Sequence, residues 1–205
     1  MDAPAPSSTP ASGLEAWLNP WQLRRAARHL RQGGLVAYPT EAVYGLGCDP
    51  RNTPALRRLL QLKRRDWRKG LILIADDLPR LAPYLRPQPA ATVQRAQASW
   101  PGGTTWLWPA HPGVSPLLRG EHASLAVRIP AHPLARALCR AARMPLVSTS
   151  ANRHGQHPAR SALEVRRKLG QSLRRYSLLI LSGRVDRAAR PSKIVDLASA
   201  QVLRS

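Results

Sequence analysis

Residues 33–50 read GGLVAYPTEAVYGLGCDP and combine a glycine pair, a short apolar run and a polar, glycine-rich segment. Its glycine pair, Gly33 and Gly34, predicts the end of a preceding helix, because glycine readily adopts the backbone conformation that terminates helices. Leu35 to Tyr38 then form a short apolar run, which predicts a buried strand. The strand runs into a loop, residues 39–50, that carries polar groups and further glycines. In α/β sheets, ligands bind at loops that follow the carboxyl ends of strands, so this loop is a candidate binding site.

Helical and strand patterns alternate on both sides of this stretch. Asn19-Pro20 offers a capping side chain followed by a proline in the first turn, which predicts a helix start, and Thr53-Pro54 predicts a second one. Further helices are expected at 90–98, from residue 133, and up to residue 169 after a cap at residue 161. Strands are expected at 71–75, 104–108, 124–129, 146–149, 177–181 and 194–197. Some neighbouring strands have no helix between them, so we predict an α/β fold with a mixed sheet.

The length of 205 residues and the hydrophobic content of 43% fit one globular domain. Residues 1–13 are rich in proline, alanine and serine and lack the apolar core of a signal peptide, so we expect a disordered tail before a domain at 14–205. The two cysteines, Cys48 and Cys139, are too few for a disulfide framework. No apolar run is long enough to cross a membrane, and we expect a cytoplasmic protein.

The formal net charge of +21 is the most extreme feature of the composition. A positive field of this size attracts polyanions such as tRNA, nucleotides and phosphates. Nearly all of the 32 basic residues are arginine, phenylalanine is absent, and alanine, leucine and proline are abundant, a skew that a codon bias also produces. Charge alone therefore leaves both explanations open.

The common signatures of nucleotide and metal sites are absent from the sequence. There is no Walker loop, and Gly45-Leu46-Gly47 lacks the third glycine of a dinucleotide fingerprint. His154 and His157 have no cysteines at metal-binding spacing, and no nucleophile elbow is present. The remaining candidates are three polar loops near strand ends.

Each polar loop has a functional and a structural interpretation. Thr40 can hydrogen-bond a small polar substrate or complete a tight turn. The basic stretch 63–70, KRRDWRKG, can receive a triphosphate or form a solvated charge run. Residues 148–152, STSAN, can hold phosphate oxygens and a ribose or form a plain hydroxyl-capped turn.

Taken together, five segments resemble the YrdC/TsaC family of threonylcarbamoyl-AMP synthases in order and spacing. The resemblance extends over roughly residues 18–198, and the chain resembles the short bacterial form of the family. The segments are GGLVAYPTEAVYGLGCDP, LKRRDWRKGLILIAD, WPGGTTWLWPA, SLAVRIPAHPLARALC and PLVSTSAN.

The resemblance implies a single-domain open twisted sheet with flanking helices around a central positively charged cavity. It implies a nucleotidyltransferase that joins L-threonine, bicarbonate and ATP into threonylcarbamoyl-AMP and releases pyrophosphate. Mg²⁺ is expected on the phosphates, held by substrate oxygens and water because no carboxylate cage is evident. A downstream threonylcarbamoyl-transferase complex would then modify an adenosine of tRNA.

Matching the family motifs residue by residue gives candidate roles. Lys63 and Arg65 match a K-x-R pair and are expected to be catalytic contacts to the ATP phosphates. The remaining ATP-binding candidates are Lys69, Ser124, Ser150, Asn152 and Ser192. L-threonine is expected to bind Thr40, Ser148 and Arg128, with Arg128 clamping the substrate carboxylate through two hydrogen bonds.

Several questions stay open on the sequence alone. Residues 184–190 are arginine-rich, and Arg184, Arg187 and Arg190 either close over the phosphates or lie in solvent. Cys48 lies beside the expected cavity, where a small buried thiol is the simpler interpretation. The charge also suits a non-catalytic module that binds double-stranded RNA or tRNA, and a related enzyme using carbamoyl phosphate is a third alternative.

Overall fold

A computed structural model describes residues 19–186 and 192–204. The strands form a nine-stranded sheet in the order β7-β1-β2-β6-β3-β5-β4-β8-β9. Three neighbouring pairs are parallel (β1 with β7, β3 with β5, β4 with β8) and the others are antiparallel, so the predicted mixed sheet is confirmed. The strands are β1 (Leu35–Pro39), β2 (Tyr44–Gly47), β3 (Ile72–Ile74), β4 (Thr104–Pro109), β5 (Ser124–Arg128), β6 (Leu146–Ser150), β7 (Leu178–Ile180), β8 (Lys193–Asp196) and β9 (Val202–Arg204).

The helices begin at the residues that the capping signals predicted. The side chains of Asn19, Asn52 and Ser161 each accept a hydrogen bond from a backbone N–H in the first turn that follows. None of the helices described is both long and apolar enough to span a bilayer. The helices are α1 (Pro20–Arg31), α2 (Thr53–Lys63), α3 (Leu78–Leu81), α4 (Ala90–Ala98), α5 (Pro116–Arg119), α6 (Pro133–Ala142), α7 (Ala162–Leu169) and α8 (Ser172–Arg175), with 3-10 turns η2 (Trp67–Lys69) and η3 (Ala82–Tyr84).

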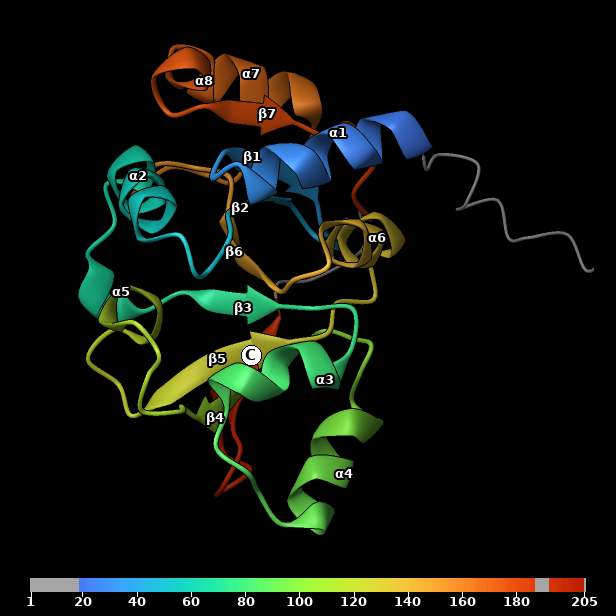
Figure 1. Cartoon of the computed structure of the whole chain (residues 1–205), viewed down its shortest axis with the longest axis vertical. Helices are drawn as coiled ribbons and strands as arrows, with labels where there is room; N and C mark the ends of the chain where they lie inside the picture. Colours follow the sequence, from blue (N-terminus) through green and yellow to red (C-terminus); the bar gives the residue numbers. More distant parts are fainter. Residues whose placement is uncertain (1–18, 187–191, 205) are drawn as a thin grey trace, which may run out of the picture.

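Helices cover the two faces of the sheet around β1 (Figure 1). On one face, α1 and α6 bury an apolar cluster that includes Val36 and Leu146. On the other face, α2 and α7 pack over a larger cluster that includes Leu35 and Val147. Because successive side chains of a strand point to opposite faces, Ser148 and Ser150 lie on the same face as Leu146. The part of this face that α1 and α6 do not cover is available for a binding site.

Strand β2 corrects one expectation from the sequence. The segment 39–50 was expected to be a loop, but residues 44–47 form a strand that pairs antiparallel with β1. The turn between them is short, and the Thr40 N–H donates to the Val43 carbonyl oxygen at 3.0 Å. Gly45 and Gly47 weaken the strand signal in the sequence, since glycine is depleted in strands. Here the small residues permit close packing: a Cβ on Gly45 would lie 3.3 Å from the Thr40 side chain and 3.4 Å from Ser148 Oγ.

Candidate active site

A hollow of about 340 Å³ lies on the open part of this sheet face. It is bordered by the β1–β2 turn, the end of β6, the start of β3 and the end of β5. Strand β5 turns one of its faces toward this hollow. Leu125 and Val127 are buried, whereas Ser124, Ala126 and Arg128 alternate with them on the less buried side. Six of the sequence-predicted site residues border this hollow: Thr40, Arg65, Arg128, Ser148, Ser150 and Ser192.

The three residues expected to bind threonine all border the same hollow. The Thr40 hydroxyl donates to the Val43 carbonyl oxygen at 2.6 Å, so the turn-forming role considered from the sequence is real. Its oxygen lone pairs still leave it able to accept a hydrogen bond. Ser148 projects from β6, and Arg128 stands at the end of β5. Arg128 follows Thr40 by 88 positions and precedes Ser148 by 20 positions, so the fold brings distant parts of the sequence together.

Arg128 is held in place by two oxygen atoms. Its Nε donates to the Gly102 carbonyl oxygen at 2.8 Å, and its NH2 group forms an ion pair with Glu41 Oε1 at 2.6 Å. The same Glu41 oxygen accepts from the Ala131 N–H at 2.7 Å. A guanidinium has five N–H donors, so the terminal nitrogens retain donors for a carboxylate. The two-bond clamp expected from the sequence must therefore use NH1 and NH2 rather than Nε.

One carboxylate oxygen of Glu41 lacks a hydrogen-bond donor among the described residues. Its Oε2 is buried, and no residue of the described ranges donates to it. Buried carboxylate oxygens normally accept at least one hydrogen bond. Glu41 borders the hollow, so a donor group on a bound substrate would satisfy this oxygen.

Arg65 joins the first hollow to a second one of about 320 Å³. Its guanidinium donates to the Gly70 carbonyl oxygen at 2.9 and 3.2 Å, which holds the basic loop against the start of β3. Burial lowers the pKa of Arg65 from its ordinary value. Lys69 and Ser124, both expected at the nucleotide, border the second hollow together with Arg119 and His122. The two hollows share Arg65, Leu71, Ile72 and Arg204.

Lys63 and Asn152 are placed differently from the other candidates, because neither borders these hollows. The Lys63 amine donates to the carbonyl oxygen of Ser150 and, at 2.9 and 3.3 Å, to the backbone and side-chain oxygens of Asn152. Ser150 Oγ donates to the same Asn152 side-chain oxygen at 2.6 Å. Lys63 is only 5% exposed, and burial, followed by repulsion from Arg65, lowers its pKa to about 8. These contacts brace the loop that follows β6.

Ser192 is buried where β4, β8 and β9 meet. Its hydroxyl accepts from Thr105 Oγ1 at 3.0 Å, and Arg204 NH2 donates to its carbonyl oxygen at 2.9 Å. Arg204 borders both hollows. The last described strand thus adds a cation that the sequence analysis did not anticipate.

A model of the Sua5/YciO/YrdC family, described as "Telomere recombination", matches residues 28–205. The chain belongs to this family. It is 52% identical over 184 residues to the threonylcarbamoyl-AMP synthase of Nitrosococcus oceani, covering 90% of this chain and 97% of that protein.

Solved structures agree with this assignment. A structure of P. abyssi Sua5 complexed with L-threonine is 31% identical with a TM-score of 0.78, covering 86% of this chain and 51% of that one. E. coli YciO is 25% identical with a TM-score of 0.70, covering 89% of this chain and 88% of that one. The family resemblance and the predicted single-domain α/β fold with a mixed sheet and flanking helices are confirmed, and the central positively charged cavity stays a prediction.

In this member of the Sua5/YciO/YrdC family, the start of the arginine-rich segment is anchored beside the site. The Tyr44 hydroxyl donates to the Gly183 carbonyl oxygen at 2.7 Å and accepts from the Gly183 N–H at 3.0 Å. His132 Nδ1 accepts from the Ala135 N–H at 3.4 Å, which leaves Nε2 to donate to the Arg184 carbonyl oxygen at 2.9 Å. Arg187 and Arg190 lie outside the described residues, as does the tail expected at 1–13.

The hollows have a clear chemical character. The first is bordered by Arg65, Arg128 and Arg204, with Glu41 as its acidic residue.

Nowhere in residues 19–186 and 192–204 do three or more His, Cys, Asp or Glu side chains gather as metal ligands would. Cys48 is fully buried, and burial raises the pKa of its thiol, which agrees with a packing role.

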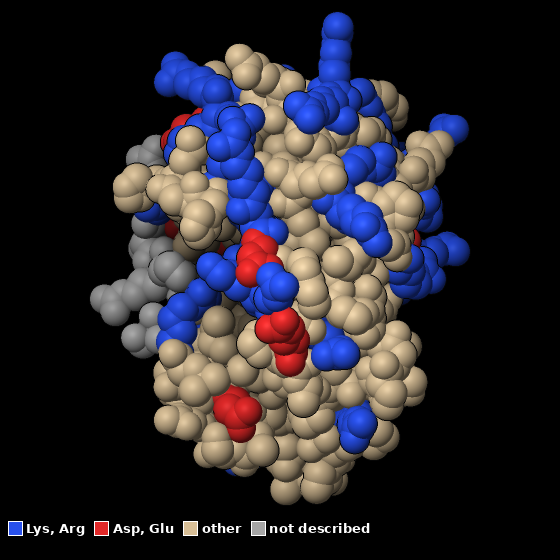
Figure 2. All heavy atoms as spheres, turned by 90° about the vertical axis from the view of Figure 1, so that its left-hand side faces the viewer, with Lys and Arg blue, Asp and Glu red and all other residues tan. Residues whose placement is uncertain are grey.

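Positive charge is not confined to these hollows. Figure 2 shows the face that carries α2 and α5, where Lys and Arg side chains gather over the upper part and the lower end is mostly uncharged. Arg57, Arg64, Arg153 and Arg175 border two other hollows in the α2 and α8 region. The distribution of charge does not by itself test RNA binding, so binding of RNA to the basic surface stays a prediction.

Proposed function

We propose that this chain is a nucleotidyltransferase that forms threonylcarbamoyl-AMP and pyrophosphate from L-threonine, bicarbonate and ATP. The observation that carries the proposal is the pair of adjoining hollows joined at Arg65. One contains every residue expected at threonine, and the other contains Lys69 and Ser124 from the nucleotide set. Relatives such as the N. oceani protein carry the name threonylcarbamoyl-AMP synthase, and Sua5 has been seen with L-threonine.

The proposed chemistry needs no protein nucleophile. The threonine amine and bicarbonate condense to a carbamate with loss of water. A carbamate oxygen then attacks the α-phosphorus of ATP, the bond from that phosphorus to the bridging oxygen breaks, and pyrophosphate leaves with the electron pair. The protein contributes orientation and positive charge, which favour a reaction between two anions.

Threonine is assigned to the first hollow. Arg128, fixed by Gly102 and Glu41, presents its remaining N–H groups to the substrate carboxylate. The unsatisfied Glu41 Oε2 takes a hydrogen bond from the carbamate N–H or the threonine hydroxyl. Thr40 and Ser148 supply hydroxyls at the same wall. This arrangement discriminates by hydrogen bonding, since an analogue without the hydroxyl leaves buried polar groups unpaired.

ATP is assigned to the second hollow, with its α-phosphate at the shared boundary. Arg65 and Arg204 border both hollows and neutralise charge where the two substrates meet, and Lys69 and Arg119 extend the positive wall. Lys63 and Asn152 act through the loop that carries Ser150, which they hold in place. They are positioning residues in this proposal.

Mg²⁺ is expected to arrive with ATP rather than to occupy a protein-built site. The described residues gather no group of three metal-binding side chains, and the carboxylate of the first hollow, Glu41, is already paired with Arg128. Mg²⁺ retains water and phosphate ligands readily. We assign no protein ligand to it.

The product is a mixed anhydride and must be consumed by an acyl transfer. We propose that a separate threonylcarbamoyl-transferase complex carries out that transfer onto an adenosine of tRNA, as the family resemblance implies. The need for ATP, threonine and tRNA together supports a cytoplasmic location for the reaction.

Pyrophosphate release from ATP by the purified chain tests this function. Release must require both L-threonine and bicarbonate, and a mixed anhydride of the expected mass must appear. Arg65→Ala should reduce the rate by about 100-fold, because a charge at the reacting phosphate is lost. Arg68→Ala is the matched control: Arg68 is on the same loop, is exposed, and pairs with Glu121 away from the hollows. Pyrophosphate release without threonine, or equal losses in both variants, would overturn the proposal.

A further inference from the structure

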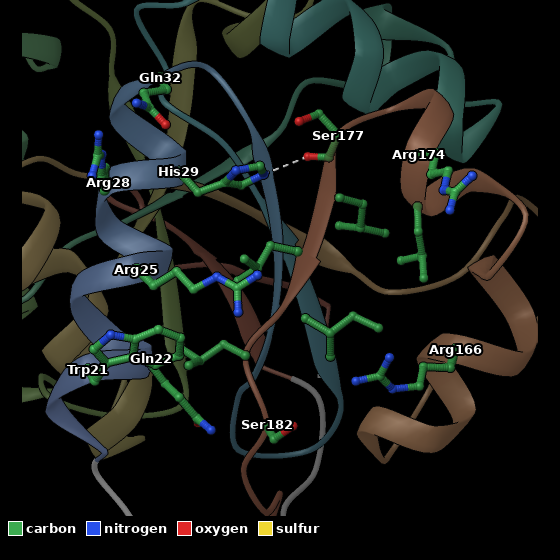
Figure 3. Close-up of a pocket in the computed structure, with 15 residues that line it drawn as sticks. Trp21, Gln22, Arg25, Arg28, His29, Gln32, Arg166, Arg174, Ser177 and Ser182 are labelled. Carbon is green, nitrogen blue, oxygen red and sulfur yellow. Dashed lines mark hydrogen bonds between the residues drawn. The ribbon is translucent and has the colours of Figure 1, made fainter.

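A groove larger than either substrate hollow lies away from both of them. It has a volume of about 760 Å³ and is bordered by α1, β7, α7 and α8 (Figure 3). None of the proposed substrate-binding residues borders it. We propose that this groove binds an extended acidic segment of a partner protein, which adds to the edge of the sheet next to β7.

The floor of the groove is the open edge of the sheet. Strand β7 is the terminal strand and pairs with β1 on one side. The Leu35 N–H donates to the Ser177 carbonyl oxygen, and the Leu181 N–H donates to the Ala37 carbonyl oxygen. Residues 177 and 181 therefore face β1, and by alternation Leu178 and Ile180 direct their backbone groups outward.

The outward backbone groups are open to a new strand. In the described part of the chain, no residue pairs with the outer side of β7. Sheet edges of this kind are normally blunted by charge, proline or a covering segment, because they template further pairing. Here α1 lies over one face of the sheet and α7 over the other, so the edge sits in a slot between two helical walls.

Each wall of the slot presents an arginine to its centre. Figure 3 shows Arg25 from α1 and Arg166 from α7 pointing inward from opposite sides. Arg25 lies over the Trp21 ring, 5.4 Å from its centre, which favours an extended side chain. Neither arginine takes part in any of the ion pairs found among the described residues, and no acidic residue borders the groove.

The geometry specifies the sequence character of the partner. Side chains of an added strand alternate between the two faces of the sheet, so one points to Arg25 and the next to Arg166. Neighbouring acidic residues therefore reach both walls. The apolar side chains of Leu173, Leu178 and Ile180 suit aliphatic residues between them. Backbone hydrogen bonds provide affinity and the two arginines provide selectivity.

A fluorescent peptide of about eight residues, with glutamate pairs flanking two valines, is a direct probe of this edge. Binding to the full chain is measured by fluorescence anisotropy. The double variant Arg25→Glu, Arg166→Glu should weaken binding by about tenfold or more, because two attractive contacts become repulsive. Arg24→Glu, Arg167→Glu is the matched control, since these exposed arginines lie on the same helices but outside the groove. The control should change affinity by less than about threefold.

Two further measurements separate strand addition from attraction by charge alone. A peptide with alternate backbone nitrogens methylated should lose binding, and the bound peptide should slow hydrogen exchange at the amides of Leu178 and Ile180. Pyrophosphate release should be unchanged in both double variants. The proposal is overturned if the unmodified peptide does not bind, if the methylated peptide binds equally well, or if both double variants lose the same affinity. Binding of a fluorescent RNA hairpin that Arg25→Glu, Arg166→Glu abolishes, with no binding of the peptide, would assign the groove to nucleic acid instead.

Discussion

The buried amine of Lys63 makes the free energy of unfolding depend on pH. Its pKa falls from 10.5 in the unfolded chain to about 8 in the folded protein. Between these values the unfolded chain holds a proton that the folded protein has released, so the free energy of unfolding must rise with pH. Each pKa unit corresponds to about 1.36 kcal/mol. A shift of about 2.5 units gives a full effect of about 3 kcal/mol, most of which is reached by about pH 10.

The assay is urea denaturation of the wild-type protein and of Lys63→Met at several pH values from about 6.5 to 10. Burial raises the pKa of Tyr38 and Cys139, and their titration lowers stability at high pH. That contribution is common to both proteins and cancels in their difference. The difference in unfolding free energy should grow by about 2 to 3 kcal/mol in favour of wild type as the pH rises.

Lys63→Arg is the control, because arginine keeps the charge and does not titrate in this range. The difference between Lys63→Arg and Lys63→Met should therefore be independent of pH. A wild-type minus Lys63→Met difference that stays constant within about 0.5 kcal/mol would refute the reasoning. It would mean that the amine is solvated and available for ATP phosphates, rather than held by Ser150 and Asn152.

Three further changes test the site. Glu41→Gln removes the charge that orients Arg128 and should raise the KM for threonine by about tenfold or more with little change in the KM for ATP. Arg204→Ala should raise the KM for ATP by about tenfold, because a cation shared by the two hollows is lost. His132 is half-buried, and this burial lowers its pKa in the folded protein. Its contribution to stability is therefore present above pH 6.5, the ordinary value, and lost as the pH falls below it. His132→Asn, which keeps a helix cap without a titrating group, should remove this part of the acid sensitivity in denaturation curves.

Each of these tests has an outcome that contradicts it. Equal changes of the threonine and ATP KM in Glu41→Gln would point to a general distortion of the hollow. An unchanged KM for ATP in Arg204→Ala would place the nucleotide away from β9. Acid unfolding of His132→Asn that follows the wild-type curve would show that the imidazole does not lose its acceptor on protonation.

Much of the fold follows from local patterns in the sequence. The helix at 90–98 and the helix that ends at residue 169 occur where predicted, because caps and apolar spacing act over a few residues. Strand β2 was missed because its glycines weaken the strand signal in the sequence. In the structure these glycines allow close packing against Tyr38 and Ser148. The short elements α3, α5, α8 and β9 were also missed, because a single turn or three residues carries little periodic signal.

The site was harder to predict than the fold. Motif matching found Thr40, Arg65 and Arg128, which the fold brings to one hollow. It could not reveal that Glu41 holds Arg128 or that Arg204 returns to the same place, since both depend on strand register across distant segments. A lysine in a basic run of the sequence also gives no sign that its amine is turned inward, as that of Lys63 is.

The order of the strands has a consequence for biosynthesis. Strand β1 pairs with β7, and β4 pairs with β8, yet both partners are synthesised long after the strands with which they pair. Pairings of such wide separation in sequence are slow to form, and an unpaired apolar strand is prone to association in the meantime. The nascent chain therefore carries an incomplete sheet until β7 and β8 have been made, and the chamber for the two substrates is assembled only after that.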